Sequence, residues 1–93
     1  MKTGVDNVVK IIFDKDNNQA IAYDNNLKIG ECVFLESEDS WNIIHTEVNN
    51  NYQGQGIAKK LVECVIENAK KCNKKIEADC SYAKKILERQ KKS

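Results

Sequence analysis

The sequence predicts an α+β domain in which an antiparallel meander of strands is followed by a strand–helix–strand unit and a final helix. Two observations lead to this prediction. In the first half of the chain, β-branched and aromatic runs alternate with polar turn residues, whereas in the second half apolar residues recur with a 3.6-residue period. The length of 93 residues fits one domain spanning residues 1–93.

Four strands are expected in the first half of the chain. They cover residues 8–13, 19–23, 27–35 and 41–48. The segment Asp24-Asn25-Asn26 indicates a hairpin, because Asn and Asp tolerate left-handed backbone angles. Gly30 interrupts the third strand, which indicates a bulge or a close approach of two backbones. Short polar turns between successive strands are typical of an antiparallel meander.

A helix of about four turns is expected after Gly56. Its apolar stripe consists of Ile57, Ala58, Leu61, Val62, Val65, Ile66, Ala69 and Cys72. Residues 74–80 then form a short strand, and residues 81–90 form a final helix with Ser81 as its N-cap. Because a helix joins the strands at residues 41–48 and 74–80, we expect these two strands to be parallel.

The charge balance and the absence of long apolar segments exclude several classes of protein. The sequence contains 15 basic and 14 acidic residues, so its net charge is +1. This charge gives no strong electrostatic field that would attract nucleic acid or an anionic membrane. No segment approaches the ~20 apolar residues of a membrane span. The first residues lack the pattern of a signal peptide, so we expect a cytoplasmic protein.

The cysteine pattern predicts no metal site. The four cysteines form no Cys-x-x-Cys pair, and His45 is the single histidine of the sequence. In a cytoplasmic protein the thiols are expected to be reduced. We interpret Cys32, Cys64 and Cys72 as structural residues, and Trp41 as part of the core.

A polar loop with two glycines lies between the strand that ends near Val48 and the helix that begins near Gly56. The first amides of a helix lack hydrogen-bond partners and carry a partial positive charge. Gly54 and Gly56 remove side chains that would hold a phosphate away from those amides. The pattern therefore predicts an anion site, although a loop that merely enters a helix has the same glycine spacing.

The motif Gln53-x-x-Gly56-x-Ala58 resembles the acetyl-CoA-binding motif of the Gcn5-related N-acetyltransferases (GNAT), Gln/Arg-x-x-Gly-x-Gly/Ala. Residues 41–87 are similar to the short single-domain members, with His45-Thr46-Glu47-Val48 before the loop and Cys80-Ser81-Tyr82 after the next strand. The resemblance implies a mixed sheet with two splayed parallel strands, between which the pantetheine arm of coenzyme A lies.

The resemblance also implies which residues bind the acetyl-CoA donor. The pyrophosphate would be held by Gln53, Gly54, Gln55, Gly56, Ile57 and Ala58, and the backbone of Glu47 and Val48 would face the pantetheine. Cys80 would line the thioester pocket. Lys84 on the final helix would meet the 3′-phosphate, unless the basic residues of that helix form only a solvated face.

The sequence departs from the full-length members of the family. They have helices after the first strand that help to build the acceptor site, and the segment from residue 13 to residue 19 is too short for them. The later strands of the family are also missing. The acceptor site is therefore open, absent or completed by a partner. Short members often have proline where this chain has Ala78.

The strand before the glycine loop carries a candidate general base. Alternation along a strand places Trp41, Ile43, His45 and Glu47 on one face. Histidine as a residue type suits proton abstraction from an amine, so His45 is a candidate general base, with Glu47 orienting it or acting through a water molecule. The alternative is that His45 packs against the sheet and Glu47 is solvated.

Cys80 and Tyr82 lie where the last strand meets the last helix. A helix N-terminus lowers the pKa of a thiol, so Cys80 is a candidate nucleophile for a two-step transfer. Alternatively, Cys80 lines the thioester pocket or is a small buried residue. In relatives a tyrosine in this helix protonates the leaving thiolate, so the resemblance implies Tyr82 as the acid.

Together these features predict an acetyl-CoA-dependent N-acetyltransferase with an unidentified amine acceptor. A non-catalytic module that binds coenzyme A or acyl-CoA is the first alternative. The second is a small interaction domain whose glycine loop binds no ligand. We expect no membrane or nucleic-acid partner, and a monomer or weak dimer formed through an exposed sheet edge.

Overall fold

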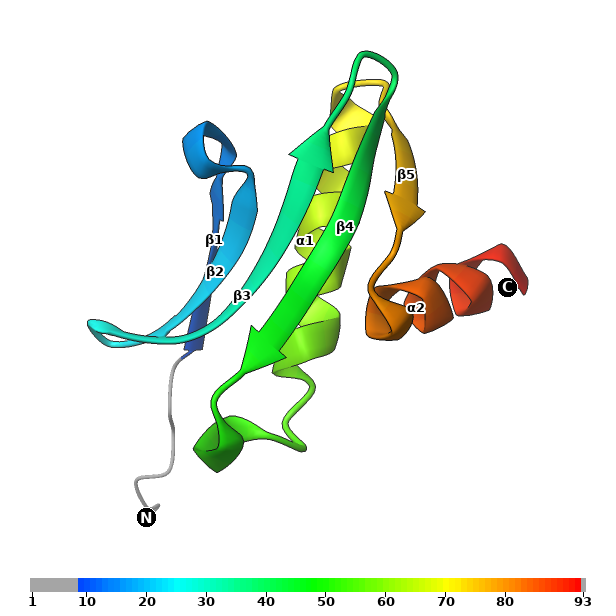
Figure 1. The fold of residues 1–93 in the computed structure, drawn as a ribbon. Helices are drawn as coiled ribbons and strands as arrows, with labels where there is room; N and C mark the ends of the chain where they lie inside the picture. Colours follow the sequence, from blue (N-terminus) through cyan, green and yellow to red (C-terminus); the bar gives the residue numbers. More distant parts are fainter. Residues whose placement is uncertain (1–8, 93) are drawn as a thin grey trace.

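The computed structural model describes residues 9–92 and shows five strands in one sheet, with two helices (Figure 1). The strands are β1 (Val9–Asp14), β2 (Gln19–Asp24), β3 (Leu27–Glu36), β4 (Ser40–Val48) and β5 (Lys75–Ala78), the helices are α1 (Ile57–Lys71) and α2 (Ser81–Lys92), and the 3₁₀ turns are η1 (Lys15–Asn17) and η2 (Asn50–Tyr52). Helix α1 lies along one face of the sheet, and α2 follows β5 at the sheet edge. The predicted α+β fold is confirmed, although Val8 lies outside the described residues.

The strands lie in chain order across the sheet, and the hydrogen bonding matches the predicted topology. Strands β1 to β4 pair antiparallel, whereas β4 and β5 pair parallel through the α1 crossover. The two N-terminal hairpins turn at Asn18 (φ 52°) and Asn25 (φ 57°), which both have left-handed backbone angles. Asp24 pairs with Leu27, so the second turn contains two residues. The hairpin predicted at Asp24-Asn25-Asn26 is therefore confirmed.

The core lies between α1 and the sheet. Helix α1 buries Ile57, Leu61, Val62, Val65, Ile66 and Ala69. On the sheet, Phe34 and Trp41 are fully buried and their rings stack with centroids 4.4 Å apart, while Phe13 stacks on Trp41 at 5.7 Å. Full burial of one Val, Leu, Ile or Phe side chain contributes roughly 1.5–3 kcal/mol to the free energy of unfolding. The helix–sheet contact is therefore the main source of stability, and the prediction that Trp41 belongs to the core is confirmed.

The end of α1 differs from the prediction. The helix stops at Lys71, and Asn73 adopts a left-handed backbone angle (φ 58°) that turns the chain toward β5. Cys72 therefore lies beyond the last helical residue and is exposed. Its prediction as the last member of the buried stripe was wrong.

The N-cap of α2 also differs from the prediction by one residue. Strand β5 is shorter than predicted, and α2 begins at Ser81. The carbonyl oxygen of Cys80 accepts a hydrogen bond from the N–H of Lys84 at 2.9 Å, which is the first helical bond. Cys80, and not Ser81, therefore has the N-cap position. Within residues 9–92, no helix is long and apolar enough to cross a membrane.

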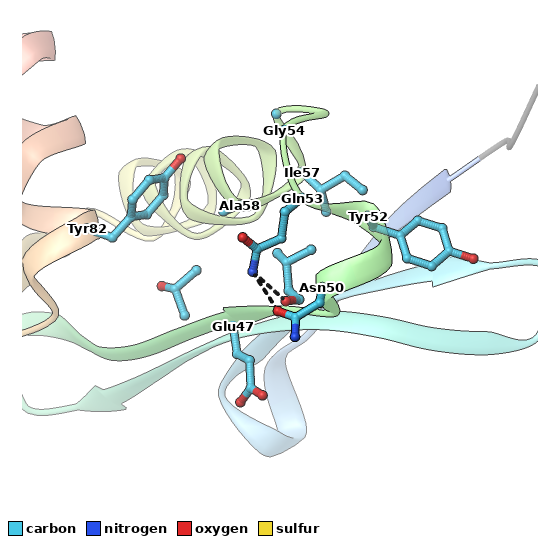
Figure 2. Close-up of a pocket in the computed structure, with 11 residues that line it drawn as sticks. Glu47, Asn50, Tyr52, Gln53, Gly54, Ile57, Ala58 and Tyr82 are labelled. Atoms are coloured by element: carbon cyan, nitrogen blue, oxygen red, sulfur yellow. Dashed lines mark hydrogen bonds between the residues drawn. The ribbon is translucent and has the colours of Figure 1, made fainter.

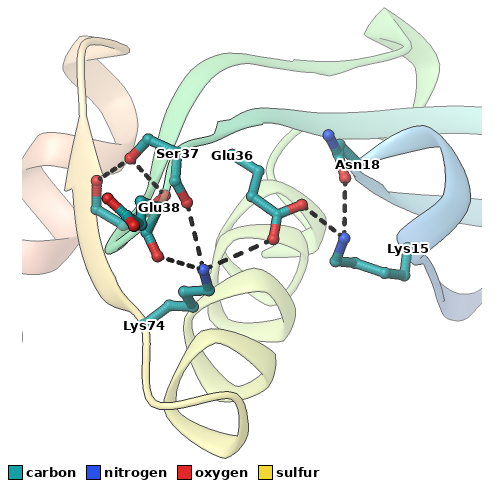
Figure 3. Close-up of polar contacts among 7 residues, drawn as sticks. Lys15, Asn18, Glu36, Ser37, Glu38 and Lys74 are labelled. Carbon is teal, nitrogen blue, oxygen red and sulfur yellow. Dashed lines mark hydrogen bonds and ion pairs between the residues drawn. The ribbon is translucent and has the colours of Figure 1, made fainter.

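Ion pairs tie together the sheet end at which β3 turns into β4 (Figure 3). Lys15 Nζ lies 2.8 Å from Glu36 Oε1, and Lys74 Nζ lies 3.8 Å from Glu36 Oε2. Lys74 also donates to the carbonyl oxygen of Glu38 at 2.6 Å. We refer to this group of Lys15, Glu36, Glu38 and Lys74 as the closed end, because it links η1, the β3–β4 turn and the segment that enters β5.

Candidate functional site

The site begins where β4 and β5 separate. The two strands pair only from Ser40 opposite Lys75 to Ile43 opposite Ala78. The N–H groups of Asp79 and Cys80 both bond to the carbonyl oxygen of Ile43, at 2.9 and 3.1 Å, and the chain then enters α2. Strand β4 continues to Val48 without a strand on this edge. The predicted splay of the parallel pair is therefore present.

A bulge at Ile44 decides which side chains face the site. Val33 pairs with His45 and Phe34 pairs with Ile43, so Ile44 has no partner on β3. After the bulge, Thr46 faces the core side, where its hydroxyl donates to the Sγ of buried Cys32 at 3.5 Å. His45 and Glu47 consequently lie on the opposite face. The prediction that they share a face with Trp41 and Ile43 was wrong, because simple alternation ignores the inserted residue.

Gly30 permits a close backbone approach beside the same part of β4. Ile29 is an extra residue in the β2–β3 pairing, which makes a second bulge. A Cβ atom on Gly30 would lie 3.0 Å from the carbonyl oxygen of Glu47 and 3.2 Å from Leu61 Cδ1. Both expectations for Gly30, a bulge and a close approach, are confirmed. A larger residue here would push the open part of β4 away from α1.

The glycine loop ends in an uncapped helix N-terminus. Gly54 (φ 82°) and Gly56 (φ 77°) have backbone angles that favour glycine, and Gly56 is the N-cap residue of α1. No side chain caps this end, and the first turn contains no acidic residue. The first helical bond runs from Lys60 N–H to the Gly56 carbonyl oxygen, which leaves the amides of Ile57 and its next two neighbours without helical partners. These amides form an electropositive surface suited to an anion.

A pocket of about 610 Å³ joins this helix end to the open part of β4 (Figure 2). Its lining consists of Thr46, Glu47, Val48, Asn50, Tyr52, Gln53, Gly54, Gly56, Ile57, Ala58 and Tyr82. Tyr82 comes from α2 and lies at the opposite end of the pocket from Tyr52 (Figure 2). The pocket therefore combines unpaired strand backbone, helix amides and one phenol from α2.

Hydrogen bonds hold the loop in place at one side of the pocket. The Gln53 amide Nε2 donates to the carbonyl oxygen of Val48 and to Asn50 Oδ1, both at 3.3 Å. The Tyr52 hydroxyl donates to Asp24 Oδ2 at 2.5 Å, which ties the loop to the end of β2. This bond to Asp24, with burial, raises the pKa of Tyr52. The loop is thus preorganised by contacts with both β2 and β4.

The sulfur of Cys80 lies next to the pocket. The thiol donates to Thr46 Oγ1 at 3.7 Å. Burial alone would raise the pKa of Cys80, but hydrogen bonds from the Ala83 backbone, the Thr46 side chain and the backbones of Tyr82 and Thr46 outweigh it and lower the pKa. A lowered pKa is the direction expected for a thiol at a helix N-terminus.

The sequence is similar to proteins of a known family. The family model described as GCN5-related N-acetyl-transferase matches residues 19–93. The chain belongs to this family. The matched residues include the glycine loop, all of β4 and α2, so the whole pocket lies within them. A search of curated proteins finds no match.

Solved structures of similar proteins share the GNAT fold. A GCN5-like putative N-acetyltransferase from Staphylococcus aureus is 34% identical, covers 92% of this chain and 83% of its own, and has a TM-score of 0.68. The ribosomal-protein-alanine N-acetyltransferase from Brucella melitensis biovar Abortus 2308 is 18% identical, with 76% and 60% covered and a TM-score of 0.60. A chain of the NatC complex bound to Gag peptide and CoA is 29% identical, with 77% and 55% covered and a TM-score of 0.61. The present chain thus spans less than two thirds of the Brucella and NatC chains.

The pocket is lined by most of the residues that were predicted to bind the donor from the resemblance to GNAT enzymes. They are Glu47, Val48, Gln53, Gly54, Gly56, Ile57 and Ala58, and the predicted acid Tyr82 also lines the pocket. Gln55, Cys80 and Lys84 are not among the lining residues. Gln55 and Lys84 are exposed, and Cys80 reaches the pocket only through Thr46. Their contact with a donor stays a prediction.

Three lining residues, Thr46, Asn50 and Tyr52, were missed by sequence reasoning. The Ile44 bulge brings Thr46 to the pocket, and neither a glycine nor a proline marks that bulge in the sequence. Asn50 and Tyr52 lie in η2, whose position depends on the Tyr52–Asp24 bond between distant segments. The place of Thr46 in the pocket lining can be predicted only when the pairing of residues between β3 and β4 is known.

In this GNAT protein the predicted general base, His45, and its partner Glu47 are in contact on the exposed face of the sheet. His45 Nε2 lies 3.1 Å from Glu47 Oε1 and 3.4 Å from Glu31 Oε2, and Lys28 Nζ lies 2.6 Å from Glu31 Oε1. The contact between His45 and Glu47 is confirmed, whereas Glu31 was missed because it joins through the register of β3 with β4. Glu31, His45 and Glu47 each have one atom that could bind a metal ion, and these three atoms lie within 4.8 Å of one another.

Proposed function

We propose that this protein is an acetyl-CoA-dependent N-acetyltransferase that transfers acetyl to an amine. The observation that carries the proposal is the pocket that joins the uncapped N-terminus of α1 to the unpaired edge of β4. Coenzyme A has an anionic pyrophosphate and an extended arm with two amide groups, and these two surfaces complement them. Membership of the GNAT family and the CoA bound in the NatC structure support this choice of donor.

The donor would lie along the pocket in one direction. The amides of Ile57 and its next neighbours would hold the pyrophosphate, with the loop at residues 53–56 around it. The amide groups of the pantetheine arm would pair with the free backbone edge of β4 between Thr46 and Val48. The thioester would then point toward Cys80, where β4 and β5 separate. Lys84 would meet the 3′-phosphate from the exposed side of α2.

The chemistry requires little from the protein. A neutral amine attacks the thioester carbonyl, the C–S bond breaks, and coenzyme A leaves as a thiolate that takes up a proton. In our proposal His45, paired with Glu47, accepts the amine proton, and Tyr82 donates a proton to the thiolate. Because His45 lies on the face opposite the pocket, the amine would approach through the gap beside residues 44–48.

Cys80 has two possible roles in this reaction. In a two-step route its sulfur attacks the thioester, coenzyme A departs, and the amine then takes the acetyl group from Cys80 and restores the thiol. In a direct route Cys80 only lines the thioester end. Mass spectrometry after exposure to acetyl-CoA distinguishes them. An acetyl adduct that persists in Cys80→Ala would exclude Cys80 as the nucleophile.

A non-catalytic coenzyme A-binding module is the second candidate, and one observation favours it. Glu47 contributes to the pocket wall, but its carboxylate points away from the pocket, toward the face that carries His45 (Figure 2). The proposed base therefore acts only if the amine reaches the donor from that face. Without such an approach, the pocket would bind coenzyme A and leave it unchanged.

Thermal unfolding with acetyl-CoA tests the shared part of both candidates. At a ligand concentration 100 times Kd, binding stabilises the folded state by about 2.7 kcal/mol, which raises the Tm of a domain of this size by on the order of 10 °C. If saturating acetyl-CoA leaves the Tm unchanged, both candidates fail. If the Tm rises but no amine in a panel of monoamines, diamines and peptides accelerates thiol release, the binding module remains.

His45→Gln tests the catalytic part. Removing a general base lowers kcat by roughly 100-fold or more, whereas acetyl-CoA should raise the Tm of the variant as much as that of the wild type, because His45 lies outside the pocket lining. The measurements are thiol release over pH and the Tm with and without donor. Unchanged turnover in His45→Gln would remove His45 from the mechanism and leave the donor site intact.

A further inference from the structure

Thr46 contacts two cysteine sulfurs at once. Its Oγ1 atom lies 3.7 Å from Cys80 Sγ and 3.5 Å from Cys32 Sγ. The Ile44 bulge turns Thr46 to the core side, and Thr46 is also part of the pocket lining. One hydroxyl therefore links the pocket surface, the thiol at the start of α2 and a thiol on β3.

The two thiols beside this hydroxyl differ in their ionisation. Cys32 is fully buried, and burial is the main reason that its pKa is raised to about 11. It therefore remains protonated through the neutral pH range. Cys80 has a lowered pKa despite its partial burial, because backbone and Thr46 hydrogen bonds favour the thiolate. The other titratable groups around the pair are Cys64, which acts on Cys32 from α1, and Tyr82 on α2.

We propose that Thr46 is a positioning residue that, with Cys32 behind it, holds Cys80 beside the donor pocket through a reversible hydrogen-bond chain. In the thiol form, Cys80 S–H donates to Thr46 Oγ1, and the Thr46 hydroxyl donates to Cys32 Sγ. When Cys80 loses its proton to solvent, the chain reverses. Cys32 S–H then donates to Thr46 Oγ1, and the Thr46 hydroxyl donates to the Cys80 thiolate.

The reversal is possible because each group has the required chemistry. A hydroxyl is both a donor and an acceptor, and its hydrogen rotates freely. Cys32 keeps its S–H at neutral pH, so it can supply a donor when the Thr46 hydrogen turns to Cys80. A valine in place of Thr46 has a similar shape but offers neither function. The Thr46 backbone N–H, which also bonds to Cys80, would remain.

This inference deepens the proposed function, and its meaning for acetyl transfer rests on that function. In the two-step route the chain would supply the thiolate, which is the nucleophilic form. In the direct route it would fix the sulfur that borders the thioester. The test measures Cys80 alone, without acetyl-CoA or turnover, so its failure is distinguishable from failure of the proposed function.

The pH dependence of alkylation tests the hydrogen-bond chain in the folded 93-residue protein. Iodoacetamide reacts with the thiolate, so the rate over about pH 5 to pH 10 reports the thiolate fraction. Trypsin cleaves after Lys and Arg, which places each cysteine in its own peptide. Cys80 falls in residues 76–84, Cys64 in residues 61–70 and Cys72 in residues 72–74. Mass spectrometry of these peptides gives each rate without replacing any cysteine.

We expect Thr46→Val to lower the Cys80 thiolate fraction near neutral pH by about tenfold, because a charge-assisted hydrogen bond is lost. Thr46→Ser keeps the hydroxyl and should retain the wild-type profile. The Cys72 profile should be the same in all three proteins, since Cys72 is exposed and beyond α1. Identical Cys80 profiles for Thr46→Val and Thr46→Ser would overturn the proposal.

A second measurement uses the wild-type chain and does not depend on the stability of a variant. Because the Thr46 N–H donates to Cys80, its amide ¹⁵N–¹H NMR signal should shift with pH at the midpoint found for Cys80 alkylation. A Thr46 signal that does not move through that midpoint would show that Thr46 does not lie against the Cys80 sulfur, which overturns the proposal even if Thr46→Val failed to fold.

Discussion

The two halves of β4 differ in their neighbours, and this difference separates stability from function. Residues 41–43 have β3 on one edge and β5 on the other, and Trp41 and Ile43 within them are fully buried. Residues 44–48 keep β3 but lose β5, and Thr46, Glu47 and Val48 line the pocket. One strand therefore serves as a core element in its first half and as a binding edge in its second half.

The same contrast exists between the two ends of the β4–β5 pair. At the closed end, Lys74 and Lys15 meet Glu36 and bind the surrounding turns (Figure 3). At the other end, α2 begins only three residues after β5 ends, and the chain turns away from β4. Ion pairs thus keep the strands together where they meet first. A helix start keeps them apart where a ligand would enter.

The largest expected effect is loss of stability from Trp41→Ala in the paired half. Trp41 is fully buried and stacks on Phe34 at 4.4 Å, so its truncation leaves a cavity in the core. Large-to-small changes of this type cost about 3–5 kcal/mol, which is a large part of the roughly 5–15 kcal/mol that stabilises a native domain. Urea unfolding followed by circular dichroism measures the effect.

Val48→Ala is the matched change in the open half. Val48 is partly buried, so the loss of two methyl groups should cost only about 1 kcal/mol. Because Val48 lines the pocket, this variant should bind acetyl-CoA more weakly than the wild type. Equal stability losses for Trp41→Ala and Val48→Ala would show that the two halves of β4 do not differ as described.

The next effect concerns binding at the glycine loop. Gly56 has a left-handed backbone angle at the N-cap of α1, a conformation that Asn and Asp tolerate better than other side chains. Both are also good N-cap residues. Gly56→Asp places a carboxylate where the pyrophosphate is proposed to bind, whereas Gly56→Asn has the same size without the charge. We expect acetyl-CoA to bind Gly56→Asp at least about tenfold more weakly than Gly56→Asn.

Isothermal titration with acetyl-CoA at two salt concentrations measures this difference. The gap between the Asp and Asn variants should narrow at high salt, because the repulsion is between exposed charges. Both variants should keep their helix content by circular dichroism. If Gly56→Asp and Gly56→Asn bind equally well at low salt, the pyrophosphate does not lie at the start of α1.

The sequence was sufficient for features that depend on nearby residues. The asparagine turns, the amphipathic α1 and the glycine loop are all encoded within a few positions, and each is present. The family resemblance added the splayed parallel pair. It also named most of the pocket lining, since its motif covers one continuous segment.

Features that depend on strand register were not predictable in the same way. The bulge at Ile44 reverses the face of every later residue in β4, so a one-residue insertion moved Thr46 into the site and turned His45 and Glu47 to the opposite face. Glu31 joined His45 only through the β3–β4 alignment. The adjacent apolar pair Ile43-Ile44, followed by polar His45 and Glu47, is a weak local signal of the changed face, whereas no local pattern links Glu31 with His45.

The smallest expected effect is at the closed end, in Glu36→Gln. A hydrogen bond from Lys15 holds the pKa of Glu36 below its usual value. A carboxyl group whose pKa is lower in the folded than in the unfolded state stabilises the fold above the unfolded pKa, near 4.3. This contribution is lost as the pH falls through the folded pKa. Wild type should therefore exceed Glu36→Gln slightly in Tm at neutral pH, and the two should converge in acid.

Thermal melts over about pH 2.5 to pH 7, at low and high salt, measure this convergence. Screening should reduce the neutral-pH difference, because both lysines are solvent-accessible. Acetyl-CoA should raise the Tm of Glu36→Gln as much as that of the wild type, because the closed end shares no residue with the pocket. A Glu36→Gln variant that binds acetyl-CoA more weakly would show that the closed end controls the separation of β4 and β5, and that the two ends are coupled.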